Sequence, residues 1–141
     1  MIALETIDGA YVVLQAVATA NPTLVGQVSR TRPSSVTLGP THLFSASPVW
    51  DIAHNTSLRN WVGTFDVWIV VPAWDNDQWI TDAWTLAQVV TDAFTDAPHF
   101  AHANSVAEPV RIREGDYQGA DSTTYPAVVV TIGRILYKEG R

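Results

Sequence analysis

Two histidines, His99 and His102, have the spacing most typical of a metal site, because residues three apart on a helix place two imidazoles side by side. The pair follows Pro98, where we expect a loop rather than a helix. The sequence contains no cysteine, and no third ligand lies near the pair in the sequence. We therefore expect ordinary surface histidines and no metal site.

Two carboxylates, Asp75 and Asp77, have a spacing that would suit acid–base chemistry or a hard cation. They also precede a long amphipathic segment, where aspartate commonly caps the first turn of a helix, and we favour that role. The hydrolase motif Gly-x-Ser-x-Gly and the glycine-rich phosphate-binding motifs do not occur in the sequence. We expect no enzymatic activity, no catalytic residue and no cofactor.

Tryptophan is concentrated in one part of the chain, with all six residues between Trp50 and Trp84. Aromatic clusters of this kind bind carbohydrate or nucleic-acid bases, but no basic run accompanies this one. We favour a tryptophan-rich core between a strand and the following helix. A subunit interface, where tryptophan is enriched, is the third interpretation.

Composition excludes several classes of protein. The 141 residues carry a net charge of −6, and the basic residues do not form a patch of the kind that binds nucleic acid. Hydrophobic residues make up 47% and charged residues 16%, which argues against disorder and is consistent with part of the surface being covered by another subunit. The amino-terminal apolar run is too short for a signal or membrane-spanning segment, so we expect a soluble protein without membrane contact.

Hydrophobic periodicity predicts the main elements. Apolar residues at Ile7, Tyr11, Leu14 and Ala18 predict a helix that ends before Pro22. We expect two short strands at 35–38 and 41–47, and a central strand at 61–71 that is apolar on both faces. A second helix follows at 77–96, and a hairpin closes the chain with strands at 109–113 and 125–137. These elements predict one α/β (α+β) domain over residues 1–141, with a mixed, mainly antiparallel sheet of about four to five strands and two main helices packed against it.

Two surfaces are candidates for interaction. The second helix has an apolar arc wider than its core stripe, so we assign the side chains of Trp79, Leu86 and Val89 to subunit contacts. The hairpin loop, 114–122, is polar and contains glycine, so we expect it to project. We assign Asp116, Tyr117 and Asp121 to contacts made by this loop.

The order of elements resembles the tail terminator proteins of long-tailed bacteriophages. The resemblance is carried by the first helix ending at Asn21-Pro22, the segment 24–33, the strand 65–71, the helix 77–94 and the closing strand 126–137. It implies a structural protein of the virion that forms a ring, with six copies, at the neck of the tail. Such a ring caps the tail tube, ends its polymerisation and joins it to the head connector or stopper protein after assembly in the host cytoplasm.

The acidic composition agrees with such a ring, because DNA passes most easily through a channel that does not neutralise phosphates. Two other functions remain open. One is another phage neck or head-completion component, which would share the ring and differ in its partners. The other is a small-ligand-binding domain that uses the tryptophan cluster.

Overall fold

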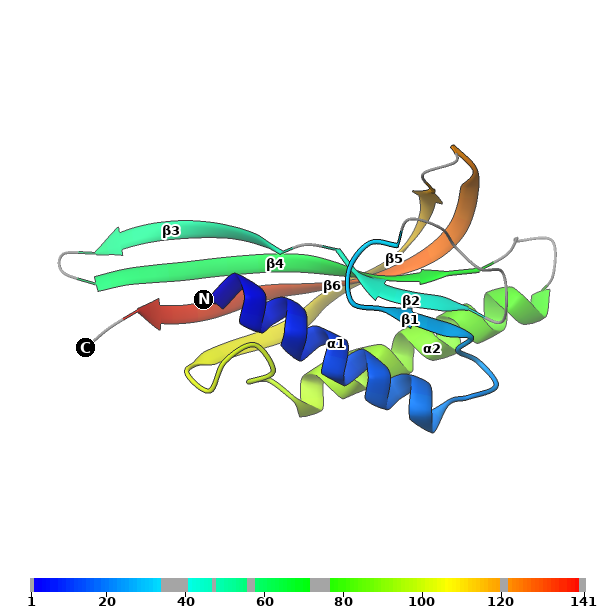
Figure 1. Cartoon of the computed structure of the whole chain (residues 1–141), viewed down its shortest axis with the longest axis horizontal. Coiled ribbons are helices and arrows are strands. Elements are labelled where there is room, and N and C mark those ends of the chain that lie inside the picture. Colours follow the sequence, from blue (N-terminus) through cyan, green and yellow to red (C-terminus); the bar gives the residue numbers. More distant parts are fainter. Residues whose placement is uncertain are drawn as a thin grey trace.

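The computed structural model describes residues 2–33, 41–46, 48–55, 58–71, 77–119 and 122–139. These residues form two helices and six strands, in the order α1 (Ile2–Ala20), β1 (Gln27–Ser29), β2 (His42–Ser45), β3 (Val49–Asn55), β4 (Leu58–Val70), α2 (Asp77–Asp96), β5 (Ser105–Gln118) and β6 (Thr124–Glu139). All six strands belong to one mixed sheet, mostly antiparallel, which confirms the expected α+β fold (Figure 1). The expected strand at 35–38 lies outside the described residues.

The sheet is built around β4 and β6, which pair with each other over residues 59–70 of β4. The strand order is β1-β2-β4-β6-β5, and only β1 and β2 run parallel. On its other side β4 pairs first with β3 and then with β2, so one long strand supports two short strands in series. The sequence analysis missed β1 and β3, because β1 has only three residues and β3 lacks a clear apolar alternation.

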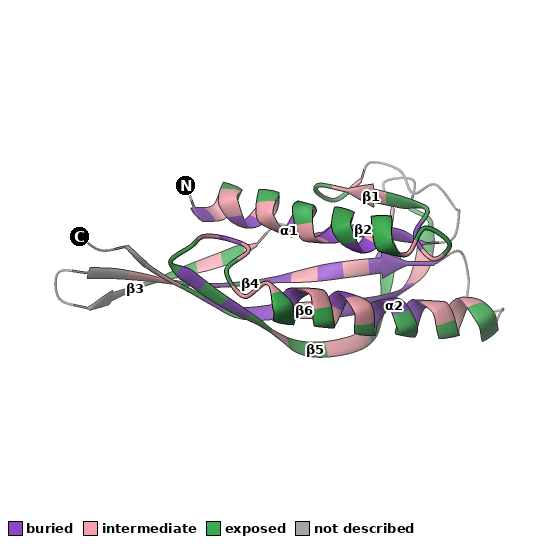
Figure 2. Ribbon diagram, turned by 90° about the horizontal axis from the view of Figure 1, so that it is seen from below, coloured by how far each residue is buried: buried purple, intermediate pink, exposed green. Residues whose placement is uncertain are grey.

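Both helices pack on one face of the sheet and bury its main hydrophobic core (Figure 2). From β4 and β6 this core takes Phe65, Val67, Ile69, Val128, Val130 and Ile132. The strand β4 is apolar on both faces as expected, but its second face is covered only near its carboxyl-terminal end, where Val70 belongs to a smaller cluster, whereas Val62 on that face is exposed. We call that opposite side of the sheet the helix-free face.

Helix α1 begins earlier than expected and buries a different stripe: Ile2, Thr6, Ala10, Leu14 and Val17. Of the expected stripe only Leu14 is buried. Gly9 explains the shift, because a side chain at this position would overlap the carbonyl oxygen of Phe100. Close packing therefore selects the side of the helix that carries Gly9 and Ala10. The larger Ile7 and Tyr11 are half-buried at the edge.

By length and composition α1 is apolar enough to cross a membrane, so the expectation that the amino-terminal segment is too short for this is corrected. Its packing against the sheet and α2 accounts for much of that character, because one stripe of the helix lies in the core. The outer side also carries apolar residues, with Leu4 and Val12 exposed by 52% and 63%.

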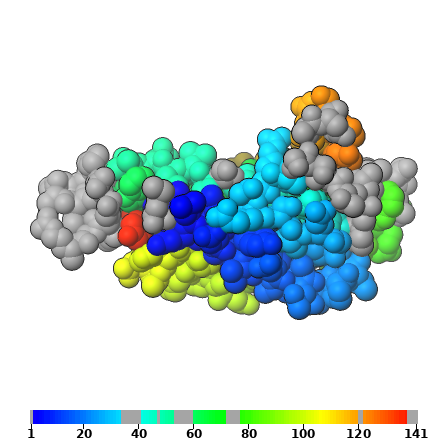
Figure 3. Space-filling model, viewed as in Figure 1, coloured from blue at the N-terminus to red at the C-terminus, as the bar shows by residue number. Residues whose placement is uncertain are grey.

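The hairpin of β5 and β6 projects from the body of the molecule (Figure 3). Both strands are longer than expected, and β5 extends to Gln118 where a loop from 114 was predicted. The projecting feature is therefore the end of a two-stranded ribbon, which we call the β5–β6 tip and define as residues 115–119 and 122–126. Backbone pairing holds this ribbon together up to Gln118 and Thr124.

Candidate interaction surfaces

Helix α2 carries the residues that the sequence analysis assigned to subunit contacts, and the structure places them differently. Leu86 is fully buried in the core, so its assignment to an exposed surface is corrected. Trp79 and Val89 are half-buried, and Val89 packs against the core. Relative to Ala83 in the core stripe, Leu86 is turned by about 60° around the helix, close enough to enter the core.

Trp84 is the large side chain that α2 exposes instead, with 38% of its surface accessible. The tryptophan-rich core favoured from the sequence does not include it, because Trp84 is turned by about 100° around the helix from the buried Ala83. Asp77 and Asp92 are exposed and lie seven residues before and eight residues after it, about 20° and about 80° from it around the helix. Gln88, between them, donates a hydrogen bond to Asp92 over 2.9 Å.

Charge is distributed unevenly between the helices and the sheet. Neither helix contains lysine or arginine, so all eight basic residues of the chain lie elsewhere. The helices contain six carboxylates: Glu5, Asp8, Asp77, Asp82, Asp92 and Asp96. The helix layer is therefore acidic throughout, although Asp8 forms an ion pair with Arg30 at 2.6 Å.

Of the three residues assigned from the sequence to contacts of the loop, Asp116, Tyr117 and Asp121, the two that the structure describes do not share one surface. Asp116 is exposed, but it lies within β5 opposite Pro126. Tyr117 is only 3% exposed and belongs to the small cluster on the helix-free face, so its assignment to a projecting contact is corrected. Asp121 lies outside the described residues. A strand alternates its side chains between two faces, so neighbouring residues of β5 cannot share one surface.

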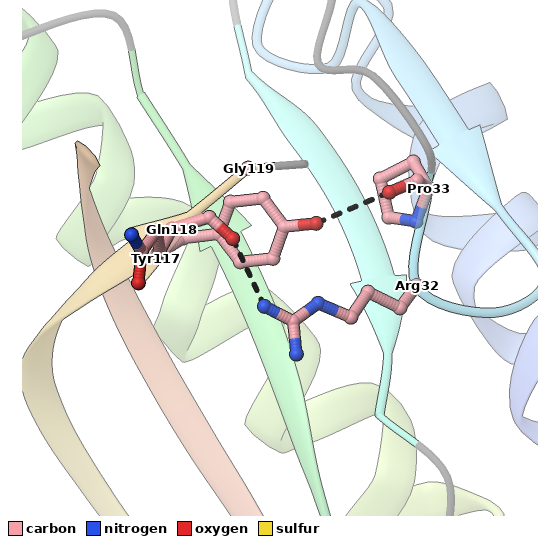
Figure 4. A pocket seen from close by; sticks show the side chains of 5 residues that line it. All are labelled: Arg32, Pro33, Tyr117, Gln118 and Gly119. Atoms are coloured by element: carbon pink, nitrogen blue, oxygen red, sulfur yellow. Dashed lines mark hydrogen bonds between the residues drawn. The ribbon is translucent and has the colours of Figure 1, made fainter. Parts of the chain in front are cut away.

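Tyr117 instead anchors the segment that follows β1 (Figure 4). Its hydroxyl donates a hydrogen bond of 3.2 Å to the carbonyl of Pro33. The Arg32 guanidinium lies 5.1 Å from the centre of the tyrosine ring and donates to the carbonyl of Gln118 over 2.9 Å. These contacts line an open hollow of about 340 Å³, in which the arginine already has its partners.

Next to this hollow, the helix-free face carries a packed aromatic group. The rings of Phe44 and Trp68 stack with centroids 6.3 Å apart, and Tyr117 packs edge-on against both. Arg113 lies 5.9 Å from the centre of the Trp68 ring and 3.3 Å from Asp66. Arg113 thus contacts both an aromatic ring and a carboxylate of this group, which is typical of a cluster that stabilises the fold.

The described tryptophans do not form a single ligand platform. Trp50 and Trp61 pack edge-to-face at 6.5 Å beside the helix-side core. Trp68 lies on the opposite face of the sheet, and Trp84 lies on the outer side of α2. The core interpretation therefore fits Trp50 and Trp61 and does not fit the exposed Trp84.

The histidines show no metal geometry, and within the described residues no three His, Cys, Asp or Glu side chains come together in a way that could hold an ion. His99 Nδ1 lies 2.6 Å from the carbonyl of Ser105, and His102 lies 3.8 Å from Glu5. His42 is buried, and its Nε2 lies 2.7 Å from the Ser29 hydroxyl oxygen. Burial lowers the pKa of His42, because its charged form loses hydration.

An exposed apolar row crosses the helix-free face where β4, β6 and β5 lie side by side. Val62, Leu136 and Val106 are directly opposite one another in register and are exposed by 38%, 51% and 51%. Paired residues of antiparallel strands share a face, and the adjacent Ile135 and Ala107 are buried in the helix-side core. The row therefore points away from the helices. We call it the apolar row.

Beside the apolar row lies a groove of about 390 Å³, lined by apolar and small residues, by two arginines and by one carboxylate: Val62, Gly63, Thr64, Val110, Gly133, Arg111, Arg134 and Asp51. Val110 is itself 45% exposed. Arg134 has a φ of 53°, in the left-handed region that residues other than glycine rarely adopt. The groove thus combines apolar walls with two arginines, and nothing in the sequence pattern revealed it, because it depends on irregular pairing of β5 and β6.

Comparison with known proteins gave one similarity that we report. No protein-family model and no curated protein sequence matches the chain. Among solved structures, the chain is similar to a chain in the virion of a native gene transfer agent particle. The two have a TM-score of 0.49 and 18% identity, over 90% of this chain and 91% of the other.

Proposed function

We propose that this chain is a structural protein of a phage-like virion, a tail terminator whose copies form a ring that caps the tail tube. The observation that carries the proposal is a pair of unlike exposed surfaces on one domain. Trp84 lies on the helix layer, and the apolar row of Val62, Leu136 and Val106 lies on the helix-free face. Contacts between unlike surfaces of identical copies run head to tail and close into rings when the rotation allows.

The order of elements supports the particular role. The sequence resemblance to tail terminators rests on a first helix, short strands, a long aromatic strand, a second helix with an acidic start and a final hairpin. The structure has these elements in that order. In the proposed ring of six copies, the β5–β6 tip, which carries Asp116, contacts the tail tube, and another surface of the ring meets the head connector or stopper protein.

DNA passes through the proposed ring without specific binding. The chain has a net charge of −6, and its helix layer contains carboxylates and no basic residue. Binding to DNA is driven largely by neutralising phosphates, so a channel formed by acidic chains would let the duplex slide.

The test is the length and labelling of tails in the particles that contain this chain. Removing its gene should give tails of irregular and mostly greater length, because nothing would end polymerisation of the tube. An antibody against the chain should label the head-proximal end of normal tails. Tails of normal length that fail to join heads would instead favour a head-completion or other neck component.

A change in tryptophan fluorescence with a small ligand would be expected only for the ligand-binding alternative. Among the described residues, Trp50 and Trp68 lie on opposite faces of the sheet, which does not favour that alternative.

A further inference from the structure

We infer that the groove beside the apolar row receives helix α2 of a second copy of this chain, with Trp84 as the anchor. This inference rests on the proposed ring and specifies which two surfaces meet. It follows from the apolar exposure, the charges and the backbone geometry of the two surfaces.

The groove has the features of a site for an apolar side chain next to negative charge. Its walls include Val62 and Val110, both exposed in the single chain, and its volume of about 390 Å³ exceeds that of an indole ring. Arg111 and Arg134 also line it. Asp51 lines it as well, on β3. Apolar walls with arginine beside them are typical of the centre of protein interfaces.

The backbone conformation of Arg134 supports a role for its charged side chain in binding at the edge of the groove. A left-handed conformation is unfavourable for a residue with a side chain, and glycine would avoid that cost. Arg134 nevertheless occupies it, at the irregular stretch of β6 that also places Gly133 against Val110. Its side chain donates to Glu108 over 3.3 Å and remains largely exposed, so the structure holds a charged group at the edge of the groove.

Helix α2 provides the complementary surface. Trp84 projects from its outer side, and Asp77 and Asp92 are exposed before and after it on the helix. No basic residue of α2 would repel the arginines of the groove. Tryptophan contributes more than most residues to binding when it enters a pocket, and flanking opposite charges select the orientation of the partner.

The two surfaces lie on opposite layers of the same domain, so one copy cannot satisfy itself. Each copy offers one groove and one helix, and the contact is head to tail. This geometry favours a second copy over a nucleic acid, which would use the arginines but leave Trp84 and the apolar row exposed.

The experiment reverses the charges of each surface separately. The groove variant carries Arg111→Glu and Arg134→Glu, and the helix variant carries Asp77→Arg and Asp92→Arg. Each alone should weaken ring formation by at least about tenfold, measured by analytical ultracentrifugation and negative-stain imaging over a range of concentrations. A mixture of the two should restore rings, because every contact in the mixture again joins opposite charges. Circular dichroism checks that each variant is folded.

Trp84→Ala tests the anchor without changing charge and should also prevent rings. The control is Glu114→Arg, a charge reversal at an exposed residue of β5 outside the groove, α2 and the β5–β6 tip, which should leave ring formation unchanged.

The outcomes separate the inference from the proposed function. If both charge-reversal variants form rings as readily as the wild type, the inference is wrong and the proposed ring is unaffected. A wild-type chain that remains monomeric at all concentrations would contradict both. If the groove variant loses binding to duplex DNA in a mobility-shift assay while its rings persist, the groove is a nucleic-acid site and the inference is wrong.

Discussion

A carboxylate at position 86 would have no water to stabilise its charge, because the Leu86 side chain is fully buried between α2 and the sheet. We predict that Leu86→Asp lowers the free energy of unfolding by about 3 to 5 kcal/mol, the usual cost of an unpaired buried charge. Urea denaturation followed by circular dichroism measures the change.

The neighbouring residue offers a matched control. Thr85 is exposed, so Thr85→Asp adds the same charge to the same turn and should change stability by less than about 0.5 kcal/mol. Equal stability of the two variants would place Leu86 on a surface after all.

His42 predicts how stability depends on pH. Its pKa is lowered in the folded chain by burial, whereas the unfolded chain has the ordinary value near 6.5. Below that pH the unfolded state binds a proton that the folded state does not, so stability is complete above pH about 6.5 and is lost as the pH falls. We predict that this group makes stability rise with pH in this range, with a slope below the limit of about 1.4 kcal/mol per pH unit for one proton.

The measurement compares the wild type with His42→Gln, which removes the titrating group and keeps a side chain able to bond to Ser29. Urea unfolding between about pH 5.5 and 7.5 should show a shallower slope for the variant. Parallel slopes would mean that His42 titrates alike in both states and would contradict the prediction.

Among the strands, β4 and β6 should be the last to open, because each has a neighbour on both sides and lies in the core. We predict that amide exchange is slowest at residues 65–70 and 127–132, which open only with the whole domain. It should be faster in β3, whose pairing within the sheet is with β4 alone.

Hydrogen exchange read by mass spectrometry or NMR checks this order. Exchange in β3 as slow as in 65–70 would show that its outer edge is protected, as it would be by another subunit. Performing the measurement on monomers and on assembled rings separates the two causes of protection.

The elements that the sequence predicted well are those whose own residues carry the signal. The alternation from Trp61 to Val71 and the 3.6-residue stripe of α2 each repeat often enough to identify a long element. The strand β3 was not predicted, because its pairing with β4 determines its conformation. The end of the β5–β6 ribbon was not predicted, because the polar residues and glycines at 114–119 resemble a loop.

At the scale of the whole molecule, the fold class follows from the order of elements, but the candidate surfaces do not. Leu86 and Trp84 are both apolar and lie on the same helix. The rotation of α2 about its own axis relative to the sheet decides which of the two is buried. The apolar row likewise joins three strands that are far apart in sequence. Register is a property of the assembled sheet, so no single segment reveals the row.

The amino-terminal end of α1 and the carboxyl-terminal end of β6 lie toward the same end of the long axis, and the β5–β6 tip lies toward the other (Figures 1 and 2). In a rotationally symmetric assembly, equivalent points of all copies fall on one circle. Gold particles attached to either terminus or to the tip would therefore each decorate one circle, and the separation of these circles would depend on how the long axis is oriented relative to the symmetry axis. Comparing the diameters and heights of these circles would give the tilt of each subunit against the symmetry axis.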